Sequence, residues 1–227
     1  MMHSGTVKPR RSVAVFDLDG TLTWRDTLVL FLMSYLLRHP WRVLGTWRLP
    51  FALFSFLARG RDRGLLKSRL IRMLMGGATR GAVDACAVSF VNGLMPRRRF
   101  RPAALAVLEA HRSAGDHLVL LSASPDLYVP RIGLSLGFEL TLCTEIEWRA
   151  DRLDGGLKTP NRRGAEKLRC LTWLRQRYPE LPIVAYGNSA SDLDHMRHAD
   201  RALLVNGNAA ARAQAAQWKI PCANWNQ

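Results

Sequence analysis

Short apolar runs alternate with longer amphipathic stretches along much of the chain, and this pattern predicts alternating strands and helices. Runs rich in valine, isoleucine and leucine are typical of buried strands, and they cover residues 13–16, 117–121, 183–186 and 202–205. Helical spacing of apolar positions predicts helices over residues 102–113, 126–136, 164–178 and 191–198. Two further strands are expected at residues 138–143 and 145–153, with a turn at 154–156. Helices between short strands indicate an α/β fold with a doubly wound parallel sheet.

The stretch from residue 23 to residue 100 shows helical patterns only. Its helical runs cover residues 27–37, 49–58, 64–75 and 82–94. The first two are apolar on all sides, but each is about half the ~20 residues that a membrane-spanning helix needs. They predict either a hydrophobic subdomain that packs on itself or helices in a membrane interface, where Trp41 and Trp47 would also fit. We expect residues 23–100 to be an insertion, and residues 1–22 and 101–227 to form one core domain.

Charge is distributed unevenly along the 227 residues. The formal net charge is +15, and residues 25–112 contain sixteen Lys or Arg against four Asp or Glu. A positive field in this region predicts an anionic partner, such as an anionic membrane surface. The run Arg97–Arg99 has no aromatic platform beside it, so nucleic acid is not expected as a partner.

Cysteine usage and the amino terminus predict a cytoplasmic protein. The four cysteines form no CxxC pair, which favours free thiols in a reducing compartment over a zinc site or a disulfide framework. The apolar run at residues 13–16 is too short for the core of a signal peptide. We therefore expect a cytoplasmic location, with peripheral contact at the inner face of the membrane as the alternative.

Two carboxylates directly follow the first apolar run. Asp17 and Asp19 fall at the expected carboxyl end of a buried parallel strand, where the chemistry of such sheets gathers. Strand alternation would point the two side chains to opposite faces, so both reach one pocket only if the chain leaves the strand, which Gly20 permits. Two carboxylates here could bind Mg²⁺, or one could attack phosphorus while the other transfers a proton. A role in helix capping needs one aspartate, not two.

Two later segments carry residues suited to phosphate. Ser122 ends the second apolar run and precedes a helix start, a position that favours phosphate binding, although serine also caps helices for structural reasons. Lys167 lies in the first turn of a long predicted helix and could supply a fixed positive charge against a phosphoryl group. Lys158 lies nearby and is the alternative.

A polar segment follows the third apolar run. Gly187 ends this run, and Asn188 and Asp192 after it offer oxygen ligands. His195 and His198 lie close by in the sequence and could suggest a second metal site. We instead expect both histidines on an exposed helix face.

Together these segments resemble the motifs of a known family. The stretch Asp-Leu-Asp-Gly-Thr-Leu-Thr at residues 17–23 is similar to the first motif of the haloacid dehalogenase (HAD) superfamily. The later motifs are matched in order by Ser122, by Lys167 and by Gly187 with Asp192. The lysine is placed as in the phosphoserine-phosphatase-like branch, HAD subfamily IB. The resemblance implies a Rossmann-like core with a helical C1-type cap inserted after the first motif.

The resemblance also implies a mechanism. Asp17 would attack phosphorus to form an aspartyl-phosphate, and Asp19 would protonate the leaving alcohol and then activate water. Ser122 and Lys167 would hold the phosphoryl oxygens. The implied cofactor is Mg²⁺, with ligands from Asp17, the Asp19 carbonyl, Asn188 and Asp192.

Two positions depart from the family pattern. Asn188 stands where the family usually has aspartate; an amide still offers an oxygen to Mg²⁺ but removes one negative charge, so metal affinity should fall. Asp26 stands where this branch often has a glutamate that recognises the substrate amine, so the match to phosphoserine as substrate is partial.

Three functions follow as hypotheses. The first is an Mg²⁺-dependent phosphomonoester hydrolase for a small phosphorylated metabolite. The second keeps this chemistry but acts on a lipid phosphate at the membrane surface, as phosphatidylglycerophosphatase C does, with the basic cap on the lipid. The third is a phosphate-binding protein without turnover, which follows if Asn188 abolishes metal binding. The sequence predicts neither the substrate nor the oligomeric state.

Overall fold

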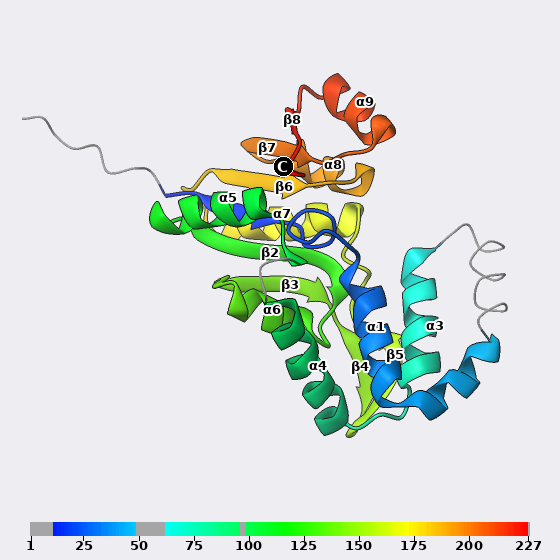
Figure 1. The fold of residues 1–227 in the computed structure, drawn as a ribbon. Helices are drawn as coiled ribbons and strands as arrows, with labels where there is room; N and C mark the ends of the chain where they lie inside the picture. Colours follow the sequence, from blue (N-terminus) through cyan, green and yellow to red (C-terminus); the bar gives the residue numbers. More distant parts are fainter. Residues whose placement is uncertain (1–10, 49–61, 96–98, 227) are drawn as a thin grey trace, which may run out of the picture.

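The computed structural model describes residues 11–48, 62–95 and 99–226, and its centre is a six-stranded parallel sheet (Figure 1). The strand order is β3-β2-β1-β6-β7-β8, so β1 lies inside the sheet. It pairs in parallel with β2 and β6, in the registers Val13↔His117 and Val13↔Ile183. The strands are β1 Val13–Phe16, β2 His117–Pro125, β3 Leu140–Thr144, β6 Ile183–Gly187, β7 Arg201–Val205 and β8 Cys222–Ala223.

Helices cover both faces of this sheet. They are α5 Pro102–Ser113, α6 Val129–Ser135, α7 Ala165–Arg177, α8 Ala190–Met196 and α9 Ala209–Gln217. Val13 and Val15 of β1 pack in one apolar cluster with α7, whereas Ala14 and Phe16 belong to a second cluster with α5 and α6. Burial on both faces explains why β1 reads as a continuous apolar run. The predicted doubly wound α/β fold is confirmed.

The segment between β1 and α5 folds into helices that extend away from the sheet (Figure 1). They are α1 Thr27–Arg38, the 3₁₀ helix η1 Pro40–Arg48, α3 Arg63–Met75 and α4 Arg80–Leu94, and we call them the cap. Phe31 of α1 and Phe90 of α4 contact the ring of Tyr128, which joins the cap to the core. The domain boundaries at residues 22/23 and 100/101 stay predictions, and the apolar run 49–58 lies outside the described residues.

A two-stranded hairpin replaces the single strand expected at residues 145–153. Its antiparallel strands are β4 Ile146–Arg149 and β5 Arg152–Leu157, with the turn at Ala150 and Asp151. The predicted turn at residues 154–156 is wrong because Gly155 lies within β5. A Cβ on Gly155 would come within 2.7 Å of the backbone of Arg72, so this glycine permits close packing of β5 on α3. The hairpin thus extends the cap from a distant part of the sequence.

Smaller differences concern the ends of elements. β2 continues to Pro125, and α6 begins at Val129 rather than at residue 126. The strand β7, expected to be the last, is followed by α9 and by β8, which pairs with β7 through Leu204 and Cys222. The alanine-rich α9 and a two-residue edge strand carry too little apolar periodicity to be recognised from the pattern alone.

Candidate active site

The carboxylate of Asp17 lies at the carboxyl end of β1 and is only 7% exposed. Its Oδ1 accepts a hydrogen bond from Nζ of Lys167 at 2.6 Å, and its Oδ2 accepts one from Oγ1 of Thr21 at 3.0 Å. Burial raises the pKa of Asp17 to about 7, because the charge of Lys167 offsets only part of the desolvation and Asp192 adds a second negative charge. A carboxylate that titrates near neutral pH beside a cleft is a candidate reactive group.

β1 ends at Phe16, and the chain then turns at Gly20, the residue that the sequence predicts to permit the turn. This glycine has φ +84°, a conformation that L side chains rarely adopt. A Cβ placed there would also lie 2.1 Å from Nδ2 of Asn188. The turn therefore requires glycine, and it brings Asp17, Asp19 and Asn188 to the same cleft.

Asp19 is held by donors from both the cap and the core. Its Oδ1 accepts hydrogen bonds from the backbone N–H and Oγ1 of Thr27, at 2.6 and 2.7 Å. Its Oδ2 accepts one from Oγ of Ser124 at 2.6 Å. Burial raises the pKa of Asp19, and the nearby charge of Asp26 adds to the shift. A fixed carboxyl group with a raised pKa can carry and release a proton.

The end of β2 contributes a different serine from the one predicted. Ser122 is fully buried, and its Oγ accepts a hydrogen bond from the backbone N–H of Ser124 at 3.0 Å. The residues of β2 that line the cleft are Ala123 and Ser124. Ser124 escaped the sequence reading because nothing in the pattern distinguishes it from Ser122. The role of Ser122 toward phosphate stays a prediction.

Lys167 joins two acidic residues, Asp17 directly after β1 and Asp192 in the first turn of α8. Its Nζ lies 2.6 Å from Oδ1 of Asp17 and 2.7 Å from Oδ1 of Asp192, and all three side chains are buried. Burial alone would lower the pKa of Lys167, but the two carboxylates outweigh it and raise the pKa. Burial would raise the pKa of Asp192, but Lys167 and a hydrogen bond from Oγ of Ser189 at 2.7 Å hold it well below its usual range. Lys167 and Asp192 are therefore a charged pair at neutral pH.

The oxygen donors at this cleft fit a magnesium ion. Asp17, Asn188 and Asp192 line it together with Asp19, whose backbone carbonyl is a further donor. Within the described ranges no three Asp, Glu, His or Cys side chains form a cluster that could hold a metal ion. The candidate ligands are therefore the two carboxylates of Asp17 and Asp192 and two neutral oxygens, from the Asn188 side chain and the Asp19 carbonyl. Mg²⁺ usually takes one or two carboxylates and completes its shell with waters and substrate phosphate.

Two other predicted residues have structural partners. Asp26 lines the cleft, but its Oδ1 caps α1 by accepting hydrogen bonds from the N–H groups of Leu28 and Val29, at 2.9 and 3.3 Å. The side chain of Lys158 is 67% exposed and pairs with Glu145 at 2.9 Å, away from the residues that line the cleft. Lys167 is thus the lysine that meets the acidic residues.

The prediction of an exposed His195 is wrong. This residue is 1% exposed, because the short helix α8 packs against α7, β6 and α9. Burial lowers the pKa of His195 to about 3, so the ring is neutral at physiological pH. Its Nδ1 has no hydrogen-bond partner in the part of the chain that the structure describes. His198 is exposed, as predicted.

The cleft has a volume of about 600 Å³ and lies between the core and the cap. Cap helix α3 contributes Arg63 and Lys67 to its lining, and the loop before α7 contributes Asn161 and Arg163. The helical pattern of residues 64–75 sets Lys67 on a polar face with other basic residues, but the side chain is only 8% exposed. Sequence periodicity could not identify it, because the cleft buries a polar position of the helix.

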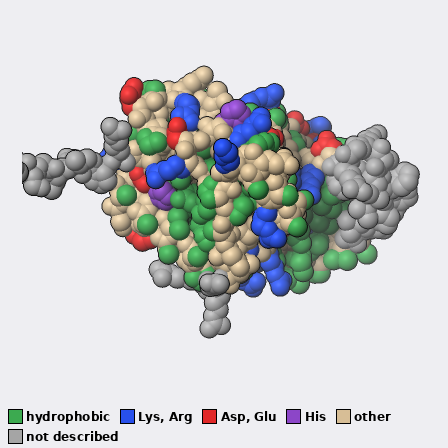
Figure 2. Space-filling view, turned by 90° about the horizontal axis from the view of Figure 1, so that it is seen from above, with side chains coloured by type: hydrophobic (Ala, Val, Ile, Leu, Met, Phe, Trp, Pro, Cys, Tyr) green, Lys and Arg blue, Asp and Glu red, His purple; other side chains and the backbone are tan. Residues whose placement is uncertain are grey.

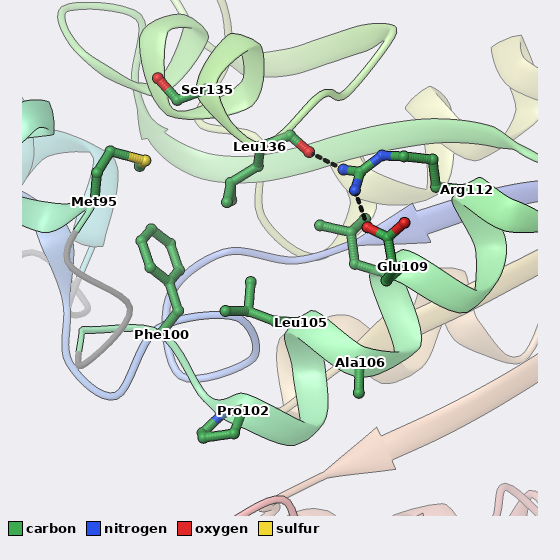
Figure 3. Close-up of a pocket in the computed structure, with 10 residues that line it drawn as sticks. Met95, Phe100, Pro102, Leu105, Ala106, Glu109, Arg112, Ser135 and Leu136 are labelled. Carbon is green, nitrogen blue, oxygen red and sulfur yellow. Dashed lines mark hydrogen bonds and ion pairs between the residues drawn. The ribbon is translucent and has the colours of Figure 1, made fainter.

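A second hollow, of about 650 Å³, lies beside α5 and the end of α6 (Figure 3). Its lining is mostly apolar and includes Phe100 and Leu105. Its two charged residues, Glu109 and Arg112, pair with each other, and Arg112 also donates to the carbonyl of Leu136. None of the predicted site residues lines this hollow, so the acidic cleft is the candidate active site.

Comparison with known proteins agrees with this geometry. The family model for haloacid dehalogenase-like hydrolases matches residues 14–197, and the chain belongs to this family of enzymes. It is 33% identical over 196 residues to "Protein CicA" of Caulobacter vibrioides, covering 83% of each chain. The predicted membership of the haloacid dehalogenase superfamily is confirmed.

Solved structures share the fold. A protein of unknown function from Bordetella pertussis Tohama I superimposes with a TM-score of 0.78 at 19% identity, covering 95% of this chain and 99% of that one. A phospho-aspartyl intermediate analogue of phosphoserine phosphatase gives a TM-score of 0.66 at 14% identity, covering 96% and 94%. Among the described residues, no helix combines the length and the apolar character needed to cross a bilayer.

Proposed function

We propose that the protein is an Mg²⁺-dependent phosphatase that hydrolyses a small phosphorylated metabolite through an aspartyl-phosphate. One observation supports this proposal more strongly than the others. Asp17, which is buried, and Asp19, which is half-buried, stand at one strand end in a cleft and have different partners. Asp17 lies against a lysine, as suits an anionic nucleophile, whereas Asp19 is bonded by neutral donors, as suits a proton carrier.

The two carboxylates divide the reaction between them. Oδ of Asp17 attacks phosphorus, the bond from phosphorus to the ester oxygen breaks, and Asp19 gives its proton to the leaving alcohol. A water molecule then attacks the aspartyl-phosphate, Asp19 takes the proton of that water, and the Asp17–phosphorus bond breaks to release inorganic phosphate. The hydrogen bonds from Thr27 and Ser124 keep Asp19 in place for both steps.

Lys167 and the end of β2 serve the phosphoryl group. The lysine has a fixed position and remains protonated, so it opposes the negative charge that gathers during transfer. Ser124 at the end of β2 lines the cleft beside this group, and contact of Ser122 with the phosphoryl oxygens stays a prediction. Mg²⁺ held by Asp17, Asn188, Asp192 and the Asp19 carbonyl would screen the repulsion between the nucleophile and the substrate.

A phosphate-release assay over a panel of esters tests this function. The panel contains small metabolite esters and one phospholipid phosphate, each assayed with Mg²⁺ and with excess EDTA. We expect Mg²⁺-dependent release from at least one small ester and none with EDTA. If no ester is hydrolysed but calorimetry detects a bound phosphate mimic, the protein binds phosphate without turnover and the proposal fails.

The variant Asn188→Asp tests the metal ligands. Restoring a carboxylate at this position adds one negative charge beside the cleft, so we expect Mg²⁺ to bind roughly tenfold more tightly. Calorimetric titration of Mg²⁺ measures this affinity directly. Asn161→Asp is the matched control, since Asn161 lines the cleft but bonds to Lys67. An equal gain in both variants would mean that any added charge attracts the ion and that Asn188 is not a ligand.

A lipid phosphate at a membrane surface is the second candidate, and the outer face of the cap favours it. Met33 and Leu37 of α1 are 55% and 82% exposed, and Val29, one turn before Met33, is 54% exposed at the rim of the cleft. Trp41 and Leu44 of η1 are 62% and 80% exposed. Figure 2 shows hydrophobic side chains grouped beside basic ones toward the right of the molecule. An exposed apolar stripe in a basic region suits an anionic membrane interface.

Sedimentation with vesicles tests the membrane hypothesis. We expect the protein to pellet with phosphatidylglycerol vesicles at low salt, and less with phosphatidylcholine vesicles, because charge contributes to binding. Replacing Leu37 and Leu44 together by glutamate should weaken binding at least about tenfold. Leu134→Glu is the matched control, as Leu134 is 79% exposed on α6 of the core. A wild-type protein that stays in the supernatant rules the membrane hypothesis out.

A further inference from the structure

One buried arginine outside the cleft lining has no carboxylate partner. Arg101 directly precedes α5 and is only 6% exposed. No Asp or Glu lies within ion-pair distance of its guanidinium in the part of the chain that the structure describes. Burial lowers the pKa of Arg101, because the charged form loses contact with water. Burying an unpaired cation costs stability, so the contacts of this arginine need an explanation.

The first contact is with the turn that follows β1. We call residues 18–23 the Gly20 turn. Nε of Arg101 donates a hydrogen bond to the carbonyl oxygen of Gly20 at 3.2 Å. The side chain of Asn188 lies directly against Gly20, and the next residue, Thr21, donates to Oδ2 of Asp17. Fixing the carbonyl of Gly20 therefore helps to fix the side chains that meet in the cleft.

The second contact is with the two segments that join the cap to the core, residues 23–26 and 99–101, which we call the cap linkers. They run antiparallel where Thr23 and Phe100 form a β-bridge. Nε1 of Trp24 donates to the carbonyl oxygen of Phe100 at 3.1 Å. The N–H of Arg101 donates to the carbonyl oxygen of Leu22 at 2.9 Å, and its guanidinium lies over the ring of Trp24, 4.3 Å from the centroid. Arg101 thus holds the junction of the cap and the core together.

The third contact is with the C-terminal segment, which lies beyond the residues that the family model matches. Nη1 of Arg101 donates to Oδ1 of Asn226. The preceding residue, Trp225, is buried, and its ring centroid lies 5.6 Å from that of Tyr186. The carbonyl oxygen of Tyr186 accepts a hydrogen bond from the N–H of Asp17 at 3.0 Å. The C-terminal segment therefore approaches the acidic site by two routes, through Arg101 and through Tyr186.

We propose that Arg101 is a positioning residue, which holds the Gly20 turn against the cap linkers and against Asn226. The turn in its fixed position keeps Asp19 and Asn188 in place at the cleft. This inference rests on the proposed function, because it assigns Asp19 to proton transfer and Asn188 to the metal. Arg101 does not line the cleft, so it acts through the turn and not on the substrate. Its several N–H donors reach two oxygens and one ring at once, which no apolar side chain could do.

A pair of arginine variants tests the positioning role. Arg101→Met removes all three contacts but keeps a long side chain. With the best ester of the panel and saturating Mg²⁺, we expect kcat to fall about 10- to 100-fold and KM to change less than about threefold, because a displaced turn misplaces the proton carrier. Arg42→Met is the matched control and should keep kcat. Nη1 of Arg42 also donates to backbone carbonyls, those of Leu74 and Gly76 at 3.3 and 2.8 Å, and its guanidinium lies over the ring of Tyr35 within the cap.

Asn226 provides a second test at an exposed position, where a substitution leaves the core intact. Asn226→Asp keeps the acceptor oxygen for Arg101 and should retain kcat, whereas Asn226→Ala should lower kcat about three- to tenfold. Gln217→Ala is the control, since Gln217 is an exposed amide at the end of α9 and should not affect kcat. Wild-type kcat in Asn226→Ala would overturn the link to the C-terminal segment.

Hydrogen exchange separates this inference from the proposed function. The N–H groups of Leu22 and Thr23 donate to the carbonyl oxygen of Leu18 within the turn, at 2.9 and 3.0 Å. In Arg101→Met these two amides should exchange about tenfold faster than in the wild type, with no such change in Arg42→Met. This result supports the inference even if no ester is hydrolysed, an outcome in which the proposed function fails alone. Unchanged exchange in the turn, or equal kcat in the two arginine variants of an active enzyme, would overturn it.

Discussion

The variant Asp17→Asn is expected to lose phosphatase activity by at least about 10³-fold in kcat, while its stability does not fall. The amide cannot attack phosphorus, so no aspartyl-phosphate forms. Burial raises the pKa of Asp17 to about 7, which means that the folded protein bears a cost for ionising this group at neutral pH and above. Removing the charge removes that cost. Phosphate release and the free energy of unfolding in urea measure the two effects.

The combination of results distinguishes a nucleophile from a structural residue. Thr21→Val removes the other hydrogen bond to Asp17 but keeps the carboxylate, so it should retain a large part of the activity. Asp17→Asn with near wild-type activity would show that the carboxylate does not attack phosphorus. A variant that loses activity only because it unfolds would show a lower free energy of unfolding, which the account does not predict.

Lys167→Met is expected to have the largest effect on stability. Without Lys167, the buried carboxylates of Asp17 and Asp192 face each other with no compensating charge, and breaking a buried ion pair in this way costs about 3–5 kcal/mol. Activity should fall as well, because the phosphoryl group loses a fixed positive charge. Urea unfolding near pH 8 measures the loss of stability.

The loss of stability in Lys167→Met is expected to depend on pH. In Lys167→Met the pKa values of both carboxylates rise, so each takes up a proton as the pH falls and the repulsion disappears. The loss of stability relative to wild type is therefore largest above neutral pH and shrinks toward about pH 5. Lys158→Met is the control: its side chain is exposed and pairs only with Glu145, so no measurable change is expected. A pH-independent loss would point to packing instead of charge.

The sheet and its acidic edge could be predicted because their signals are local. β1 is apolar at every position since it is buried on both faces, and the turn at Gly20 needs the conformation that glycine adopts most readily. The hairpin β4–β5 could not be recognised, because Gly155 in β5 predicts a turn from the sequence. In the structure this glycine instead permits close packing of β5 on α3. That contact joins segments far apart in the sequence.

The cap side of the site could not be predicted for a similar reason. Lys67 occupies a polar position of an amphipathic helix, and only the approach of the core at Ala123 buries it. Arg163 depends in the same way on a loop that meets the cap in three dimensions, whereas Ser124 lies in β2 and the sequence pattern does not distinguish it from Ser122. His195 is the opposite case. Its position among acidic residues in the sequence predicted an exposed side chain, but tertiary packing of α8 buries it. The acidic residues after β1 were accessible to sequence reasoning, whereas residues that close the cleft from the cap and from the loop before α7 were not.

The central claim is that Asp17 becomes covalently phosphorylated, and one structure tests it directly. Crystals grown with Mg²⁺ and beryllium fluoride, which mimics a phosphoryl group, should show continuous density from Oδ of Asp17 to beryllium, with Lys167 beside the fluorides. Density bound elsewhere in the cleft, with the carboxylate of Asp17 still held only by Thr21 and Lys167, would contradict the account.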